Sequence, residues 1–489
     1  MPRSTHYAYS GLLFIPQRFN RLILMAMQLA LPVLLRIRLR RWLPTGIARV
    51  EVVNAEGLAK LYSQFQSGQC RFILAFRHPE VDDPLSMLYL LSRAVPQAAR
   101  QHHIPLRSPI HSHFVYDRGM TIWAGKWLGW LFSRLGGIPI HRGKRIDRAG
   151  IRAVRALLLH GQFPLAIAPE GATNGHSEVV SPLEPGVAQL SFWCAEDLKK
   201  AGRTEQVYII PIGVQYHYIH PIWPQIDRLL SRMEQDVGLS ALATPPHAVE
   251  GRYQRVLRLA NSLLSEMEAF YQRFYPQHVT VVPPLEDASV GAAHLDNRPV
   301  IQRLYALRDT ALKVAEAYFG LNGQGTIIDR CRRLEEAGWH AIYREDLPAP
   351  LKRLPPFRRG LADWGAEEAT IRLRHMRLVE SFVAVTADYL EEKPTAERFA
   401  ETVLLMFDVV ARIRGDRIPA RPRLGWRQSR VTVGDPICVS DRQPLYERDH
   451  ASAKQAVTAL TQDLQTALEH MISSTAPLIS PDGSNIPPA

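Results

Sequence analysis

The chain has few of the features that identify several large classes of protein. Only 4 of its 489 residues are cysteines, and they are scattered without the spacing of a zinc site or a redox pair: Cys70, Cys194, Cys331 and Cys438. The nucleophile motif Gly-x-Ser-x-Gly of serine hydrolases does not occur. A disulfide scaffold, a zinc module and a serine hydrolase are therefore disfavoured, and we expect no metal ion in the functional site.

Apolar runs long enough to cross a membrane are also missing. The stretch 22–35 is largely apolar, but it is shorter than the ~20 residues that a transmembrane helix needs. It is followed by a basic cluster of Arg36, Arg38, Arg40 and Arg41. Basic side chains beside an apolar helix favour binding to an anionic lipid surface. We expect residues 1–46 to attach peripherally or monotopically to the cytoplasmic face of a membrane; the alternative is an amphipathic helix packed on the protein's own core.

The charge balance indicates an anionic partner. The formal net charge is +12, while 46% of the residues are hydrophobic and 22% are charged, as in a folded protein with a sizeable core. Nucleic acid, a phospholipid surface and an acidic carrier protein would each fit this charge. The chain has no zinc finger, RNP-like motif or Gly-rich single-strand binding segment. We therefore expect membrane phospholipids as a partner and no nucleic acid.

Residues 47–215 follow an α/β pattern. Short apolar stretches that predict strands alternate with helical stretches such as 84–94 and 148–159, and they lie at 50–53, 72–76, 138–140, 165–167 and 207–214. This alternation predicts a mixed sheet flanked by helices. Polar motifs follow several of the predicted strands, at the sheet edge where α/β proteins usually form their sites.

The composition changes after Val214. Long charged stretches there predict helices at about 250–273, 297–319, 325–338, 365–391 and 395–414. A strand-like stretch returns at 430–439, and a helix is predicted at 450–472. We therefore predict an α/β domain at 47–215, a mainly helical insertion at 216–420, a closing part of the domain at 421–473, and a disordered tail at 474–489. A lid, a docking surface for a carrier protein, an oligomerisation element and an independent scaffold are all compatible with the insertion.

His78 and Asp83 form the clearest chemical pair. They follow the apolar run 72–76, and Pro79 and Pro84 place a turn between them and a helix start at Asp83. On one continuous helix, residues five apart would point about 140° apart, so the turn is needed to bring them together. A histidine can accept a proton near neutral pH, and a carboxylate beside it can fix its tautomer. The pair predicts a general base with its orienting group, although a helix cap and a surface histidine would give the same residues.

Three further blocks follow in order. They are Gly136 to Arg142 (Gly-Gly-Ile-Pro-Ile-His-Arg), Ala168 to Asn174 (Ala-Pro-Glu-Gly-Ala-Thr-Asn) and the β-branched run 207–214 around Pro211. With His78 and Asp83, these four blocks resemble the glycerolipid acyltransferases of the lysophosphatidic acid acyltransferase type. The third block departs from the family's usual Pro-Glu-Gly-Thr, because Ala172 occupies the threonine position and Thr173 follows it.

The resemblance implies a role for each block. It makes His78 and Asp83 catalytic, and it makes the remaining motif residues substrate-binding: Arg142, Gly137, Glu170, Gly171, Thr173 and Pro211. A guanidinium is suited to a phosphate because its donors match the phosphate oxygens. The glycine of the third block lets backbone amides approach a ligand. Pro211 is interpreted as a mainly structural wall of the site.

The implied reaction is direct attack without a covalent acyl-enzyme. His78 takes the proton of the acceptor hydroxyl, which attacks an acyl-CoA or acyl carrier protein thioester, and no cofactor is expected. The predicted function is a membrane-associated O-acyltransferase of phospholipid biosynthesis that converts lysophosphatidic acid to phosphatidic acid. Glycerol-3-phosphate or another lysophospholipid or lysoglycolipid as acceptor, and a noncatalytic membrane scaffold, are the alternatives.

A second group of histidines stands between the first two blocks. No carboxylate or cysteine lies at a convincing ligand spacing beside His102, His103, His111 and His113. We predict a solvated loop or a patch facing a lipid headgroup there.

Overall fold

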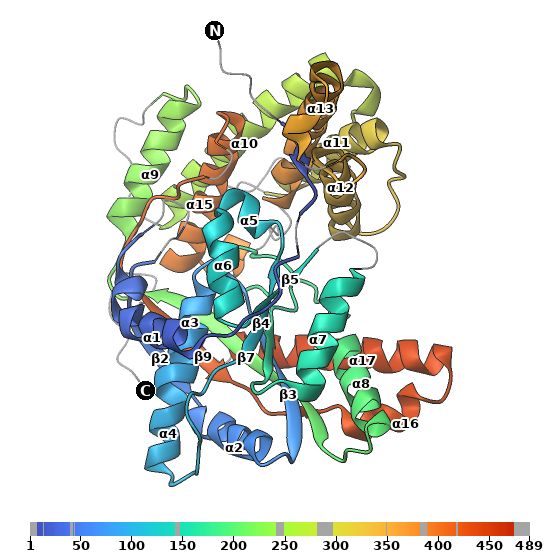
Figure 1. Cartoon of the computed structure of the whole chain (residues 1–489). Helices are drawn as coiled ribbons and strands as arrows, with labels where there is room; N and C mark the ends of the chain where they lie inside the picture. The colour runs from blue at the N-terminus through green and yellow to red at the C-terminus, as the bar shows by residue number, and fades with distance from the viewer. Residues whose placement is uncertain are drawn as a thin grey trace. The chain divides into compact units, whose positions relative to one another are not determined.

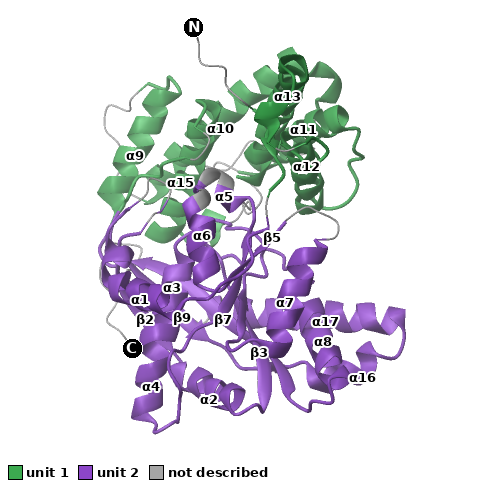
Figure 2. Ribbon diagram, in the orientation of Figure 1, with its two compact units in different colours: residues 1–13, 142–145, 222–424 green, residues 14–141, 146–221, 425–489 purple. Residues whose placement is uncertain are grey.

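The computed structural model describes residues 7–12, 14–39, 43, 45–141, 147–240, 249–280, 297–348, 350–381, 389–416 and 419–473. The chain divides into two compact units, coloured separately in Figure 2. An α/β unit comprises residues 14–141, 146–221 and 425–489, and a helical unit comprises residues 1–13, 142–145 and 222–424. Residues 14–39, which we predicted as part of a separate N-terminal segment, thus pack within the α/β unit. The predicted disordered tail at 474–489 lies outside the described residues.

The α/β unit is built on a mixed sheet of eight strands (Figure 1). Its strand order is β2-β9-β7-β3-β6-β4-β5, and β10 pairs with β7 beside β9. The strands are β2 (Ile47–Val53), β3 (Cys70–Phe76), β4 (His113–Asp117), β5 (Gly137–Ile140), β6 (Leu165–Ile167), β7 (Gln206–Tyr218), β9 (Arg427–Val433) and β10 (Ile437–Cys438). Pairing is parallel except where β9 and β10 run antiparallel to β7. A mixed sheet flanked by helices, as predicted, is confirmed.

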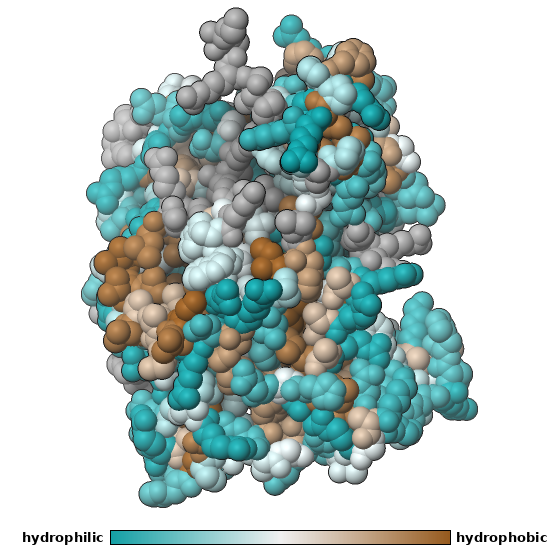
Figure 3. All heavy atoms as spheres, viewed as in Figure 1, coloured by the Kyte–Doolittle hydropathy of each residue, from teal (hydrophilic) through white to brown (hydrophobic). Residues whose placement is uncertain are grey.

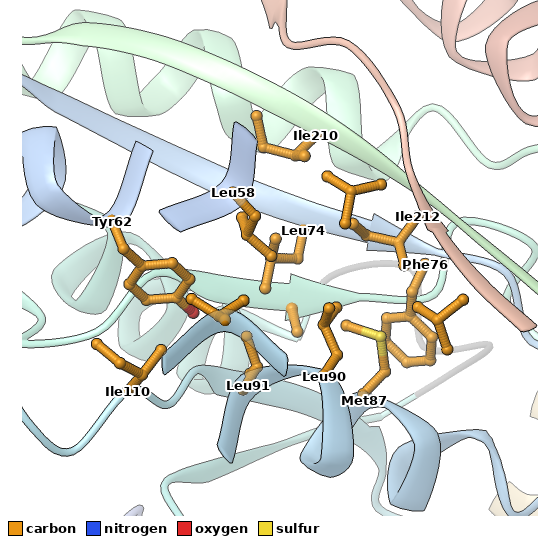
Figure 4. Close-up of a cluster of buried hydrophobic side chains, with 14 of the residues drawn as sticks. Leu58, Tyr62, Leu74, Phe76, Met87, Leu90, Leu91, Ile110, Ile210 and Ile212 are labelled. Atoms are coloured by element: carbon orange, nitrogen blue, oxygen red, sulfur yellow. The ribbon is translucent and has the colours of Figure 1, made fainter. Parts of the chain in front are cut away.

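Alternation along the strands divides the core between the two faces of the sheet. In β3, Leu74 and Phe76 point to one face, while Ile73 and Ala75 point to the other. Figure 4 shows Leu74 and Phe76 among side chains from the neighbouring strand and helices. Leu74 is fully buried, so truncating it to alanine would cost about 2–5 kcal/mol.

Helices cover both faces of this sheet. The face of Leu74 is packed by α1 (Arg21–Arg36), α2 (Ala55–Gln66), α3 (Asp83–Tyr89), η1 (Leu90–Ala94) and α4 (Val95–Gln101). The face of Ile73 is packed by α7 (Arg148–His160), α8 (Gly186–Lys200) and α17 (His450–Ser473). The remaining short helices of the unit are α5 (Met120–Trp123), α6 (Lys126–Arg134), η4 (Ser440–Arg442) and α16 (Gln443–Tyr446).

Helix α1 is apolar on two opposite faces. Its first turn is capped by Asn20, whose side chain accepts hydrogen bonds from the backbone amides of Leu22 and Ile23. Three leucines of one face are buried, namely Leu24, Leu31 and Leu35. The other face exposes Leu22, Met25, Leu29 and Val33 to solvent. One face of α1 therefore packs on the protein's own core, as one of the two alternatives predicted, while the opposite apolar face is exposed among the described residues.

The helical unit consists mainly of long helices. Its elements are β1 (Tyr9–Ser10), α9 (Trp223–Asp236), α10 (Val249–Phe274), η2 (Pro276–His278), α11 (Arg298–Phe319), α12 (Ile327–Ile342), β8 (Tyr343–Arg344), η3 (Leu351–Arg353), α13 (Pro356–Glu380), α14 (Tyr389–Glu392) and α15 (Ala396–Ile413). Buried ion pairs join the helices, as where Arg330 of α12 contacts Glu316 of α11 at 2.8 Å. The mainly helical insertion is thus confirmed, but α9 was not predicted, and α13 begins earlier than the predicted 365.

The histidine group between the first two blocks differs from its prediction. His111 and His113 are buried, and His113 begins the unpredicted strand β4. His111 Nε2 lies 2.8 Å from the carbonyl oxygen of Leu135, and Phe163 packs against both imidazole rings. Burial lowers the pKa of His111 to about 4, so this ring is neutral at neutral pH. The prediction of a solvated loop or a patch facing a lipid headgroup was therefore wrong for these two residues.

Candidate active site

Polar residues gather where the parallel strands of the sheet end. β3, β6, β4 and β5 are neighbours in that order and run parallel, so their carboxyl ends lie along one edge. His78 follows β3 and Glu170 follows β6. The first and third sequence blocks therefore meet at the edge where α/β folds form their sites.

His78 and Asp83 are brought together by the turn that the prolines predicted. Nδ1 of His78 lies 2.9 Å from Oδ2 of Asp83. Asp83 is the first residue of α3, and Asp82 holds the cap position, so the predicted cap at Asp83 is shifted by one residue. The His78 side chain is 23% exposed, while that of Asp83 is fully buried. The pair thus presents a reachable imidazole backed by an inaccessible carboxylate.

Both oxygens of the Asp83 carboxylate are held. Oδ2 accepts a hydrogen bond from the backbone amide of Glu80 at 2.9 Å, in addition to its contact with His78. Oδ1 accepts a hydrogen bond from the phenolic hydroxyl of Tyr216 in β7. Burial raises the pKa of Asp83, while the hydrogen bonds from His78 and Tyr216 oppose that rise. The carboxylate is therefore fixed in position by groups from two separate elements.

Glu170 braces the turn that carries His78. Its Oε1 accepts the backbone amide hydrogen of His78 at 3.0 Å. Its Oε2 accepts hydrogen bonds from the Asn174 side chain and the Ser181 backbone amide, each at 3.0 Å. The guanidinium of Arg77 lies 3.6 Å away, and neither side chain is exposed. Within the described residues, both carboxylate oxygens of Glu170 are thus occupied by the protein itself.

Arg77 ties the same turn to the loop after the third block. It is completely buried, and its guanidinium donates to the carbonyl oxygens of Ser177 at 2.6 Å, His176 at 3.1 Å and Val179 at 2.6 Å. A buried arginine needs such partners, because leaving its charge unsatisfied costs several kcal/mol. Arg77 and Glu170 therefore form an internal framework beneath His78.

The strand that returns after the insertion supplies a third support. Arg427 of β9 donates to Oδ2 of Asp82 at 2.9 Å, and the same oxygen accepts the backbone amide hydrogen of Thr45 at 2.7 Å. The Arg427 guanidinium also lies over the Tyr216 ring, 4.6 Å from its centroid. The closing part of the α/β unit thus fixes both the start of α3 and the tyrosine that holds Asp83.

The third and fourth blocks contain the predicted site residues Gly171, Thr173 and Pro211, and each of them lies in a different environment. Gly171 adopts a φ of +73°, which a residue with a Cβ rarely tolerates, and so it is required for the turn. Thr173 is exposed and has no hydrogen bond to the described residues. Pro211 is buried in β7, and its carbonyl oxygen accepts the Gly434 amide hydrogen at 2.9 Å, where pairing changes from β9 to β10. The missing N–H of a proline is tolerated at such an interruption.

The second block is only partly described. Gly137 lies in β5, and a Cβ there would approach the Phe114 ring to 2.8 Å, so the glycine is required for packing. Arg142 lies outside the described residues. The chain on either side of it is anchored by Asp147, which accepts the His141 amide hydrogen at 2.9 Å and an Arg118 hydrogen at 2.7 Å. Burial opposes ionisation of Asp147, but these donors outweigh it and lower the pKa of the carboxyl.

Sequence reasoning missed several residues that build the site. Arg77 and Asn174 are adjacent to or within the quoted blocks, and their polar side chains next to buried strands were an available signal. Tyr216 and Arg427 gave no local signal, because their roles depend on the pairing of β7 with β9 across the insertion. Among the described residues, no group of three His, Cys, Asp or Glu side chains is arranged to hold a metal ion.

The arrangement is suited to general base catalysis. Because Nδ1 of His78 is directed at the Asp83 carboxyl group, Nε2 is left to accept a proton. An imidazolium formed in this way is stabilised by the carboxylate behind it. A hydroxyl group is the natural substrate atom for such a base.

Comparison with known proteins agrees with this chemistry. Residues 49–215 match the family model described as Acyltransferase. No curated protein and no solved structure matches the chain. The match covers β2 to most of β7, and so includes His78, Asp83, Glu170 and Pro211.

Proposed function

We propose that this O-acyltransferase acylates lysophosphatidic acid to give phosphatidic acid. The starting point is that residues 49–215 form an acyltransferase domain of the glycerolipid acyltransferase family. The acyl donor is a thioester of coenzyme A or of acyl carrier protein. The observation that carries the proposal is the 2.9 Å contact between His78 and Asp83 at the ends of the parallel strands.

The pair supports a single-displacement reaction. Nε2 of His78 takes the proton of the acceptor hydroxyl as its oxygen forms a bond to the thioester carbonyl carbon. The carbon–sulfur bond breaks when the tetrahedral intermediate collapses, and the leaving thiolate takes the proton from the imidazolium. Asp83 stabilises that imidazolium throughout. Base catalysis of this kind contributes about 10²–10⁴ in rate, and substrate positioning supplies much of the remainder.

We base the proposed acceptor on the positive charge of Arg142 and on the acyltransferase family of the domain. Arg142 is the expected phosphate ligand, Gly171 contributes a turn, and Thr173 contributes an exposed hydroxyl. Glu170 is assigned here to bracing His78, because its oxygens already have protein donors. Ala172 lacks the hydroxyl of the usual threonine, so glycerol-3-phosphate and other lysophospholipids belong in the test as alternative acceptors.

We place the α/β unit on the cytoplasmic face of a membrane through α1. None of the described helices is long and apolar enough to cross a bilayer. The outer face of α1 carries Leu22 and Leu29, which are 74% and 80% exposed, and apolar side chains gather over this helix in Figure 3. α1 packs against α3, the helix that begins with Asp83.

The acceptor panel tests the proposal. Wild type, His78→Ala and the surface control His103→Ala receive labelled acyl-CoA or acyl carrier protein, with lysophosphatidic acid, glycerol-3-phosphate and neutral lyso lipids. We expect wild type and the control to acylate lysophosphatidic acid, and His78→Ala to lose at least ~10²-fold in kcat. Preference for another acceptor would replace the substrate but keep the mechanism. Absence of transfer to every acceptor would overturn the enzyme assignment.

Membrane attachment has a separate test. The double variant Leu22→Ser/Leu29→Ser removes apolar area from the exposed face of α1 and leaves its buried face intact. We expect it to release the protein from vesicles that bind wild type, while turnover of detergent-dispersed substrate is retained. Unchanged vesicle binding would contradict the role of α1.

A further inference from the structure

Helix α13 of the helical unit has an apolar face that no described element covers. Its opposite face is buried against α11 and α12 through Ala366, Leu373 and their neighbours. Phe357, Leu361 and Trp364 are 78%, 52% and 66% exposed. Residues three and four apart lie on one side of a helix, so the three form a single protruding stripe over two turns. A Cβ added at Gly360 or Gly365, beside this stripe, would meet no atom within 4 Å.

Positive charge surrounds the first turn of this helix. Lys352, Arg353 and Arg358 are exposed, and residues 347–362 contain no Asp or Glu. The first turn of α13 itself has no acidic residue. Cations at a helix N-terminus oppose the helix dipole, which favours negative charge at that end. The local charge is therefore complementary to an anionic partner.

We propose that the N-terminal end of α13 is a second lipid-binding element, which inserts Phe357, Leu361 and Trp364 into an anionic bilayer surface. Aromatic and leucine side chains flanked by Lys and Arg are the composition that binds the interface between headgroups and acyl chains. The three side chains expose roughly 400 Å² if each large side chain presents ~150–250 Å² when free. This is about half of the ~800 Å² that each partner contributes to a stable protein complex, and it is sufficient for a shallow lipid anchor.

Helix α1 has a similar arrangement. One of its apolar faces is buried and the other is exposed, and arginines follow the helix in the sequence. The inference gives the helical insertion a role, and it is independent of which acceptor the α/β unit acylates.

Vesicle binding by the full chain tests the inference. Wild type is compared with Phe357→Ser/Leu361→Ser/Trp364→Ser on vesicles of phosphatidylcholine with and without phosphatidylglycerol. The matched control is Phe270→Ser/Phe274→Ser/Ile413→Ser, which changes three exposed apolar residues elsewhere in the same unit. We expect the α13 variant to lower the partition coefficient on anionic vesicles by at least ~10-fold, and the control to leave it within about twofold of wild type.

Two further readouts identify the partner. Lipids with brominated acyl chains should quench part of the tryptophan emission of wild type, and Trp364→Phe should remove that part. Replacing Lys352, Arg353 and Arg358 by serine should weaken binding to anionic vesicles and leave binding to neutral vesicles unchanged. Undiminished partitioning of the α13 variant would overturn the proposal. Loss of self-association in ultracentrifugation, or loss of acyl carrier protein binding, with lipid binding intact, would assign the stripe to a protein partner instead.

Discussion

The phenolic hydroxyl of Tyr216 donates a hydrogen bond to one oxygen of the Asp83 carboxylate, and the other oxygen faces His78. Tyr216 lies on β7 and Asp83 begins α3, so this bond ties the sheet to the turn that carries His78. Tyr216 is a positioning residue, because it acts on the proton acceptor only through Asp83.

Removing the Tyr216 hydroxyl should slow the reaction and change its pH dependence. A hydrogen bond to a charged group is worth about 1.5–3 kcal/mol, so Tyr216→Phe should lower kcat/KM by about 10- to 100-fold. In the wild-type protein this hydrogen bond lowers the pKa of Asp83. Removing the bond should raise that pKa and move the acid limb of the rate profile to higher pH. Tyr208→Phe, on the same strand, is the control. Equal rate losses with an unshifted profile would indicate only a structural role.

Replacing Glu170 should destabilise the fold as well as the site. Glu170→Gln removes the charge that faces the buried Arg77 guanidinium and places an amide group against the donors of Asn174 and Ser181. Breaking a buried ion pair in this way costs about 3–5 kcal/mol, measurable by urea unfolding. Glu56→Gln, which breaks a surface pair with Lys60, should change stability far less, because solvent screens an exposed pair. A purely acceptor-binding Glu170 would instead raise the KM for the acceptor and leave stability unchanged.

Ionisation of the buried Asp83 carboxyl group should lower the free energy of unfolding, although the proposed mechanism requires the ionised form. Its pKa in the folded protein is raised above the ordinary 3.8 by burial. Between the unfolded and folded pKa values, the native state binds more protons than the unfolded state, so the free energy of unfolding falls as pH rises through that range. Asp83→Asn does not titrate. We therefore expect the variant to gain stability relative to wild type from pH 4 upward and to lose activity; a difference that is constant with pH would contradict this.

His111 should make the protein sensitive to acid. Its pKa is lowered by burial to about 4, whereas in the unfolded chain it titrates near 6.5. As pH falls from 6.5 to 4 the unfolded state gains a proton that the native state lacks, and the free energy of unfolding drops by about 3 kcal/mol. His111→Gln should flatten this part of the stability curve, and the exposed His103→Gln should not. Urea titrations at several pH values give the comparison.

Local patterns were sufficient to predict the turn that brings His78 and Asp83 together. The strand 70–76, the two prolines and the pair His78 and Asp83 lie within fifteen residues, so short-range geometry determines where they fall. Strand β4 was missed because its sequence His-Phe-Val-Tyr-Asp begins and ends with residues that are usually solvated. Burial of His113 depends on packing by Phe163, which lies fifty residues away.

The supports of the site required the tertiary structure. Tyr216 and Arg427 are separated by the whole insertion, and they meet only because β7 and β9 pair antiparallel. The role of Glu170 could likewise not be predicted from the sequence, since a Glu-Gly turn does not indicate which groups donate hydrogen bonds to the glutamate oxygens. Side chains whose function depends on long-range pairing leave no periodic or spacing signal.

The position of Arg427 has a consequence for how the protein is made. A ribosome adding ~5–20 residues per second needs about 10–40 s to pass from Tyr216 to Arg427. During that interval the residues of β3, α3 and β7 have been synthesised, but Asp82 and Tyr216 still lack the Arg427 guanidinium that holds them in the folded protein. The support that Arg427 gives to the turn that carries His78 therefore forms only after β9 has been synthesised, and a chain that stops before Arg427 lacks it.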